Sequence, residues 1–268
     1  MILLQQGVEF NGIVVSRRNY RERDMLVEIL TDRYGFKTFF IRGAKKRGFR
    51  LAAAILPFSH GSYVGSINDD GLSFIDTARE VRQYQNICQD IELNAYASYI
   101  LSLGKIALKE DVANALLWCA KFQKAVELID EGFDAQIITN IIEIQLLECF
   151  GVRPHLESCV ICQNTKLAFD FSENYGGLLC QKHWYLDKNR LRLDPRTIYY
   201  LRLLSVVDLE RLSSINVKKE TKDRLQATID RIYQDQVGVY VKAKDFIRQL
   251  KDINYFLVSD NERIDVDK

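Results

Sequence analysis

The segment Gly151-Val152-Arg153-Pro154-His155-Leu156-Glu157-Ser158-Cys159-Val160-Ile161-Cys162 opens a pattern of metal ligands that closes with Cys180-Gln181-Lys182-His183. A C-x2-C pair is followed, after 17 intervening residues, by a C-x2-H pair. This spacing is typical of structural zinc sites, in which each pair contributes two ligands. Three thiolates and one imidazole would fill all four positions of a tetrahedral zinc ion and leave none for water. The sequence therefore predicts one structural Zn²⁺ bound by Cys159, Cys162, Cys180 and His183.

A disulfide framework is the main alternative for these cysteines. Residues 1–6 lack the basic segment and the long apolar core of a secretory signal, so we expect a reducing, cytoplasmic compartment that leaves thiols free for metal. The most apolar segment, residues 137–150, is too short for a membrane crossing and carries polar residues. His155 is a second candidate for the imidazole ligand, ranked below His183.

The first 80 residues have the pattern of β structure. Short runs rich in Val, Ile, Phe and Thr are separated by glycine and charged residues, and they fall at residues 12–16, 25–31, 36–41, 62–67 and 72–77. Five short strands at this spacing predict a small barrel of the oligonucleotide/oligosaccharide-binding (OB) type, with an SH3-like barrel as the alternative.

From about residue 80 the apolar residues recur at helical intervals, and residues 137–150 are apolar on most faces, as in a buried central helix. Gly151 and Pro154 end this pattern, which resumes after Asp194-Pro195. We therefore predict an α+β protein with several domains. They are an OB-fold domain at 1–80, an all-α domain at 81–153 and 191–268, and an inserted zinc-binding module at 154–190.

The positive charge is concentrated near the N-terminus. Residues 1–50 hold 11 Lys/Arg against 5 Asp/Glu, whereas the whole chain has a net charge of +1. Two loop-like clusters carry most of this charge, and the aromatic residues Tyr20, Phe39, Phe40 and Phe49 lie in or beside them. Phe39 and Phe40 are successive residues of an expected strand, so only one of the two can face outward and stack on a base. Cations that neutralise phosphates beside rings that stack bases suit nucleic acid, especially single strands. The predicted DNA-binding residues are Arg17, Arg18, Tyr20, Arg21, Arg42, Lys45, Lys46, Arg47 and Arg50.

Two other functional classes are alternatives to DNA binding. In the first, the basic clusters are ordinary solvated surface, and the chain is a non-catalytic, zinc-stabilised protein-interaction scaffold that does not bind DNA directly. In the second, the chain is a metal-dependent nuclease, which would require clustered carboxylates that the basic segments lack. The sequence contains no phosphate-binding loop, no G-x-G-x-x-G and no G-x-S-x-G, so we predict no catalytic residues and no enzymatic activity.

Over nearly its whole length the chain resembles the RecO family of bacterial recombinational repair proteins. The resemblance depends on Gly12-Ile13-Val14-Val15, Asn19-Tyr20-Arg21-Glu22-Arg23-Asp24-Met25-Leu26-Val27, Arg42-Gly43-Ala44-Lys45-Lys46, Leu56-Pro57-Phe58, Tyr96-Ala97-Ser98-Tyr99 and the segment Gly151–Cys162. The order of these motifs agrees with the order of the expected elements. Two differences are His183, where many relatives have cysteine, and Arg47-Gly48-Phe49-Arg50, where relatives often have a serine before the arginine.

The resemblance implies a role in DNA repair and homologous recombination, with an N-terminal OB domain, a helical domain and a zinc module. It implies binding to single- and double-stranded DNA and annealing of complementary strands. It also implies work with RecR, sometimes with RecF, to load RecA onto DNA covered by single-strand-binding protein. A soluble, nucleoid-associated protein without a membrane partner is the corresponding expectation.

Overall fold

A computed structural model of the chain describes residues 4–69 and 71–264. The ends of the predicted first and helical domains, residues 1–3 and 265–268, lie outside these ranges. The chain divides into two compact units, Met1–Glu131 with Tyr240–Lys268, and Gly132–Val239. The division falls between the helix that ends at Asp130 and the helix that begins at Ala135. The predicted domains instead followed the change from strand to helix and the cysteine spacing, and their boundaries stay a prediction.

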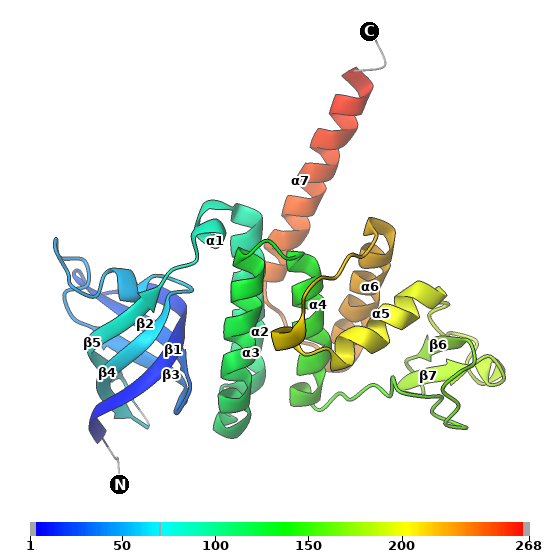
Figure 1. Ribbon diagram of the computed structural model, residues 1–268, viewed down its shortest axis with the longest axis horizontal. Coiled ribbons are helices and arrows are strands. Elements are labelled where there is room, and N and C mark those ends of the chain that lie inside the picture. The colour runs from blue at the N-terminus through cyan, green and yellow to red at the C-terminus, as the bar shows by residue number, and fades with distance from the viewer. Residues whose placement is uncertain (1–3, 70, 265–268) are drawn as a thin grey trace. The chain divides into compact units, whose positions relative to one another are not determined.

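Five strands of the first unit form a closed barrel in the order β1-β2-β3-β5-β4 (Figure 1). Neighbouring strands are antiparallel except for the parallel pair β3 and β5. Their bounds are β1 Leu4–Tyr20, β2 Asp24–Thr31, β3 Gly35–Ile41, β4 His60–Asn68 and β5 Ser73–Arg82. The five predicted strands are confirmed. The predicted length of β1 was wrong, because this strand pairs with β4 along its first part and with β2 along its second part, closing the barrel.

Alternation along the strands fills the barrel with aromatic and aliphatic side chains. The ring of Phe10 stacks between Phe39 and Tyr63, with centroid distances of 5.4 and 5.6 Å. Tyr63 donates a hydrogen bond of 2.8 Å to the Ala54 carbonyl, and burial raises the pKa of its hydroxyl. Phe39 is fully buried and Phe40 lies on the outer face, as the period of two requires for successive residues.

Four helices complete the first unit: α1 Gln85–Gln89, α2 Ile91–Leu108, α3 Val112–Asp130 and α7 Lys242–Ile264. The side chain of Asp90 caps α2 by accepting from the backbone of Glu92 and Leu93, and Asp111 caps α3 through Asn114. The helical region begins at α1 rather than near residue 80, because β5 continues to Arg82. Helix α3 packs on β2 and β3, and α2 packs on α7.

The second unit contains three helices and a two-stranded sheet: α4 Ala135–Leu146, α5 Pro195–Val206, α6 Lys219–Ile232, β6 Phe169–Ser172 and β7 Gly177–Cys180. As predicted, α4 is buried on nearly every face, and its buried Glu143 accepts from Asn140 and Gln226. Helix α5 begins at Pro195, as the Asp194-Pro195 pair predicts, and the Asp194 side chain caps it by accepting from the amides of Arg196 and Thr197. None of the described helices combines the length and the apolar character that crossing a membrane requires.

Candidate metal centre and nucleic-acid interface

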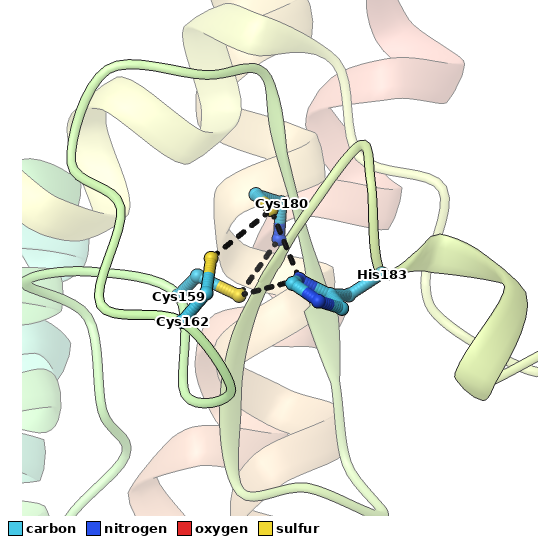
Figure 2. Close-up of side chains that lie close together, drawn as sticks. All are labelled: Cys159, Cys162, Cys180 and His183. Atoms are coloured by element: carbon cyan, nitrogen blue, oxygen red, sulfur yellow. Dashed lines mark hydrogen bonds between the residues drawn. The ribbon is translucent and has the colours of Figure 1, made fainter.

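The four predicted metal ligands converge on one point (Figure 2). Cys159 and Cys162 come from a turn that precedes β6, Cys180 is the last residue of β7, and His183 lies in the turn that follows. Their ligand atoms all lie within 4.8 Å of one another. Sequence spacing thus identified the whole cluster that the described residues form.

Backbone hydrogen bonds bring the first cysteine pair beside the second. His155, four residues before Cys159, lies along β7, where its amide donates to the Gly176 carbonyl and its carbonyl accepts from the Leu178 amide, each at 2.9 Å. A Cβ at Gly177 would lie 2.5 Å from the His155 carbonyl, so only glycine permits this approach. The amide of Val160 then donates to Leu178 at 2.9 Å, which fixes the turn carrying Cys159.

The distances within the cluster fit a tetrahedral zinc ion. Zinc bonds of about 2.3 Å to sulfur and about 2.0 Å to nitrogen give tetrahedral edges of about 3.8 Å between sulfurs and about 3.5 Å between sulfur and nitrogen. The Cys162 and Cys180 sulfurs are 3.7 Å apart, and the His183 Nδ1 lies 3.6 Å from the Cys159 sulfur and 3.3 Å from that of Cys180. The donor set and its size therefore fit a small divalent ion with sulfur and nitrogen ligands.

The cluster is suited to bind a cation and is shielded on most sides. Cys159 and Cys180 are buried, His183 is partly buried and Cys162 is exposed. Burial opposes the thiolate of Cys159, but backbone amides of Cys180, Cys162 and Ile161 donate to its sulfur and lower its pKa to about 6. A thiolate is the form that binds metal, so this environment prepares the ligand.

His155 is not part of the cluster of ligand atoms, and its Nε2 lies 2.8 Å from the Ser158 hydroxyl instead. Behind the cluster, Trp184 donates from its indole nitrogen to the Leu179 carbonyl at 3.0 Å. Arg190 stacks over the Trp184 ring at 5.1 Å and pairs with the buried Asp170 at 3.0 Å. These contacts hold the turn after His183 against β6 and β7.

Eight of the nine predicted DNA-binding residues are cations, and all eight are exposed. We call them the basic rim: Arg17, Arg18, Arg21, Arg42, Lys45, Lys46, Arg47 and Arg50. The prediction that the first group lies in a loop was wrong for Arg17 and Arg18, which are on β1 because this strand continues to Tyr20. Arg21 is in the tight turn to β2.

The second group follows β3 and is fastened to the first. The Gly43 amide donates to the Asp24 carboxylate at 2.8 Å, and the Lys45 amide donates to the Arg23 carbonyl at 3.1 Å. These two hydrogen bonds place both groups at the same end of the barrel.

The cations of the basic rim lack carboxylate partners. Throughout residues 4–69 and 71–264, none of the eight forms an ion pair, whereas Lys37, on the same strand β3, pairs with Asp69 at 3.8 Å. The Arg21 guanidinium lies 5.2 Å from the centroid of the Tyr20 ring, which is partly buried. A surface of like charges without internal partners favours a polyanionic ligand.

An aromatic row beside the basic rim was not predicted as a whole. Tyr20, Phe40 and Phe74 lie edge to face, with centroid distances of 6.0 and 6.1 Å. Sequence reasoning named Tyr20 and Phe40 as stacking candidates but missed Phe74, whose only signal was its alternation with Ile75 on β5. Phe49, another candidate, packs partly against the barrel core.

Comparison with known proteins agrees with this architecture. Residues 6–84 match the family profile described as "Recombination protein O N terminal", and residues 88–245 match "Recombination protein O C terminal". The chain is 60% identical over 250 residues to the DNA repair protein RecO of Ligilactobacillus salivarius, covering 92% of this chain and 96% of that protein.

It is 54% identical over 242 residues to the DNA repair protein RecO of Latilactobacillus sakei, covering 90% of this chain and 89% of the relative. It is 44% identical over 243 residues to that of Enterococcus faecalis, covering 91% and 92%. With both family profiles matched in order and these identities over most of its length, the chain belongs to the RecO family of DNA repair and recombination proteins.

Proposed function

We propose that this chain is a recombination mediator that binds single- and double-stranded DNA through the basic rim and anneals complementary strands. The observation that carries the proposal is the set of eight exposed cations at one end of the barrel, none of which forms an ion pair with another residue in the described part of the chain. Lys and Arg that neutralise phosphates displace counterions and supply affinity that does not depend on sequence. Such contacts can hold two strands near one another, and base pairing then supplies the free energy of annealing.

The barrel order β1-β2-β3-β5-β4 supports an OB-type fold for this DNA-binding part, in which the parallel pair of β3 and β5 closes the sheet. The Cys3His cluster supports one bound Zn²⁺ in a structural role, with all four positions filled by protein. Zinc there would contribute to the folding of residues 154–190, since the bound ion stabilises only the folded ligand arrangement.

The family resemblance supports the remaining parts of the proposal. We expect the chain to act with RecR, sometimes with RecF, in placing RecA on DNA covered by single-strand-binding protein, without catalysis of its own and at the nucleoid in the cytoplasm. Annealing by phosphate neutralisation needs no nucleotide hydrolysis, in keeping with the lack of a phosphate-binding loop in the sequence.

The test is annealing of complementary oligonucleotides, followed by fluorescence quenching, with and without single-strand-binding protein. The variant Lys45→Ala/Lys46→Ala/Arg47→Ala removes three exposed cations of the basic rim. We expect it to anneal more slowly and to bind DNA more weakly while its circular dichroism spectrum is unchanged.

A matched control removes three exposed cations of the second unit, Arg196→Ala/Lys218→Ala/Lys219→Ala, which changes the net charge equally. It should anneal as the wild type does. Equal losses in both variants would point to overall charge and remove the basic rim from the site. A wild-type protein that fails to bind plain oligonucleotide in dilute buffer would instead favour the scaffold alternative.

A further inference from the structure

A pocket of about 450 Å³ lies on the outer surface of the barrel, next to the basic rim. Its lining includes Phe40 from β3, Phe74 and Asp76 from β5, and Lys46, Arg47 and Arg50 from the segment after β3. This volume is within the range of pockets that hold small molecules, about 300–1,000 Å³. The pocket lies wholly within the first compact unit.

The aromatic part of the pocket is built by strand pairing between distant parts of the chain. The parallel pairing of β3 and β5 sets Phe40 opposite Phe74, and their rings meet at 82°. The Phe74 side chain is 43% exposed, in contrast to Phe39, which is fully buried in the barrel. Exposed rings beside a pocket offer a face on which a flat, apolar group of a ligand can stack.

Charge is distributed unevenly over the same pocket. Lys46, Arg47 and Arg50 provide exposed cations, which attract phosphate. Asp76 is exposed and lines the same pocket as Phe74. A carboxylate repels a phosphate, but it accepts hydrogen bonds from amino groups, so the part near Asp76 and Phe74 suits a base rather than the sugar-phosphate backbone.

We propose that this pocket takes one unpaired nucleobase of a single strand, which stacks on Phe74 and donates from its exocyclic amine to Asp76. The backbone of the strand follows the cations of the basic rim. Adenine, cytosine and guanine carry such an amine and thymine does not. In a duplex the bases are stacked on their neighbours, so the pocket distinguishes single strands from double strands. This inference rests on the proposed DNA binding and specifies which form of DNA the site prefers.

The experiment measures binding by fluorescence anisotropy at fixed, moderate salt. The probes are end-labelled oligo(dC) and oligo(dT) and a blunt duplex of the same length. We expect Phe74→Ala to weaken binding of oligo(dC) by about 5- to 140-fold, the effect of losing one stacked base. Duplex affinity should stay within about twofold, because phosphate contacts supply it.

Two further variants separate stacking from other effects. Phe74→Trp keeps an aromatic face and should keep single-strand affinity, whereas Asp76→Ala should reduce the preference for oligo(dC) over oligo(dT). Phe40→Leu tests the same pocket from β3, and thermal unfolding of each variant shows whether the barrel is intact.

Equal affinity of wild type and Phe74→Ala for single strands would overturn the proposal. This is the result expected if the pocket binds an acidic peptide instead of a nucleobase. Equal losses for single strands and duplex would overturn it as well. A wild-type protein that binds none of the three probes would refute the proposed DNA binding itself, so the two failures are distinguishable.

Discussion

Removing three cations from the basic rim should change how steeply DNA affinity falls with salt. The perturbation is Lys45→Ala/Lys46→Ala/Arg47→Ala, in a segment that is fastened to the β1–β2 turn through backbone groups of Gly43 and Lys45. Alanine retains those backbone hydrogen bonds. The fold should therefore survive, and only phosphate contacts should be lost.

The structure sets an upper limit on the magnitude. If all eight cations of the basic rim neutralise phosphates of a single strand, the logarithm of affinity falls with the logarithm of salt at a slope of about −5.6, or about −0.7 for each contact. The triple variant keeps five contacts and should show a slope of about −3.5. Between 50 and 200 mM salt the wild type would then lose affinity by roughly 2,000-fold and the variant by roughly 130-fold.

The assay is fluorescence anisotropy of a labelled oligonucleotide, titrated at four or more salt concentrations, with Arg196→Ala/Lys218→Ala/Lys219→Ala as the charge-matched control. A difference of about two in slope between wild type and variant, absent from the control, is the expected result. The reasoning is refuted by parallel slopes in wild type and triple variant, or by wild-type binding that does not depend on salt.

Three other measurements test the metal centre and the packing. Metal analysis should find one zinc per chain in the wild type and less in Cys159→Ser; a wild type without zinc contradicts the cluster's proposed role. Gly104→Ala should lower the free energy of unfolding by about 1–3 kcal/mol in urea, because its Cβ would lie 2.1 Å from the Phe122 ring; an unchanged midpoint contradicts this packing. Burial opposes ionisation of Asp194, but hydrogen bonds from Thr197 and Arg224 lower its pKa from 3.8 to about 2 in the folded state. The carboxylate therefore stabilises the fold at pH values above the pKa of the unfolded state, and this stabilisation is lost as the pH falls through the pKa of the folded state. The difference in unfolding free energy between wild type and Asp194→Asn should therefore shrink from pH 4 to pH 2, and a constant difference would exclude this role.

Features that depend on short stretches of chain could be predicted from sequence. Two residues separate Cys159 from Cys162, and two separate Cys180 from His183, so one tight turn suffices to present both side chains of each pair. Asp194 before Pro195 fixed the start of α5 for a similar local reason. The number of strands could be predicted from runs in which apolar residues alternate with a period of two, but the residues at which the strands end could not.

Other features required pairing between distant segments. The sequence located the charges of the basic rim but not the Asp24–Gly43 hydrogen bond that holds its two groups together. It left open which of Phe39 and Phe40 faces outward, since alternation gives opposite faces but not which face is the core. In the closed barrel Phe39 is buried in the core, so Phe40 is the residue that faces outward.

The amino-acid sequence by itself determined which cysteines and histidine form the Cys3His cluster, the strand-rich first part, the concentration of positive charge and the family. Only the tertiary structure decided that Phe40 and Phe74 share a pocket with cations and Asp76. The physical reason is that ligand spacing and charge are properties of neighbouring residues. The meeting of β3 with β5 depends instead on closing the barrel, which buries the aromatic core and leaves Phe74 exposed and Phe40 partly exposed on the outside.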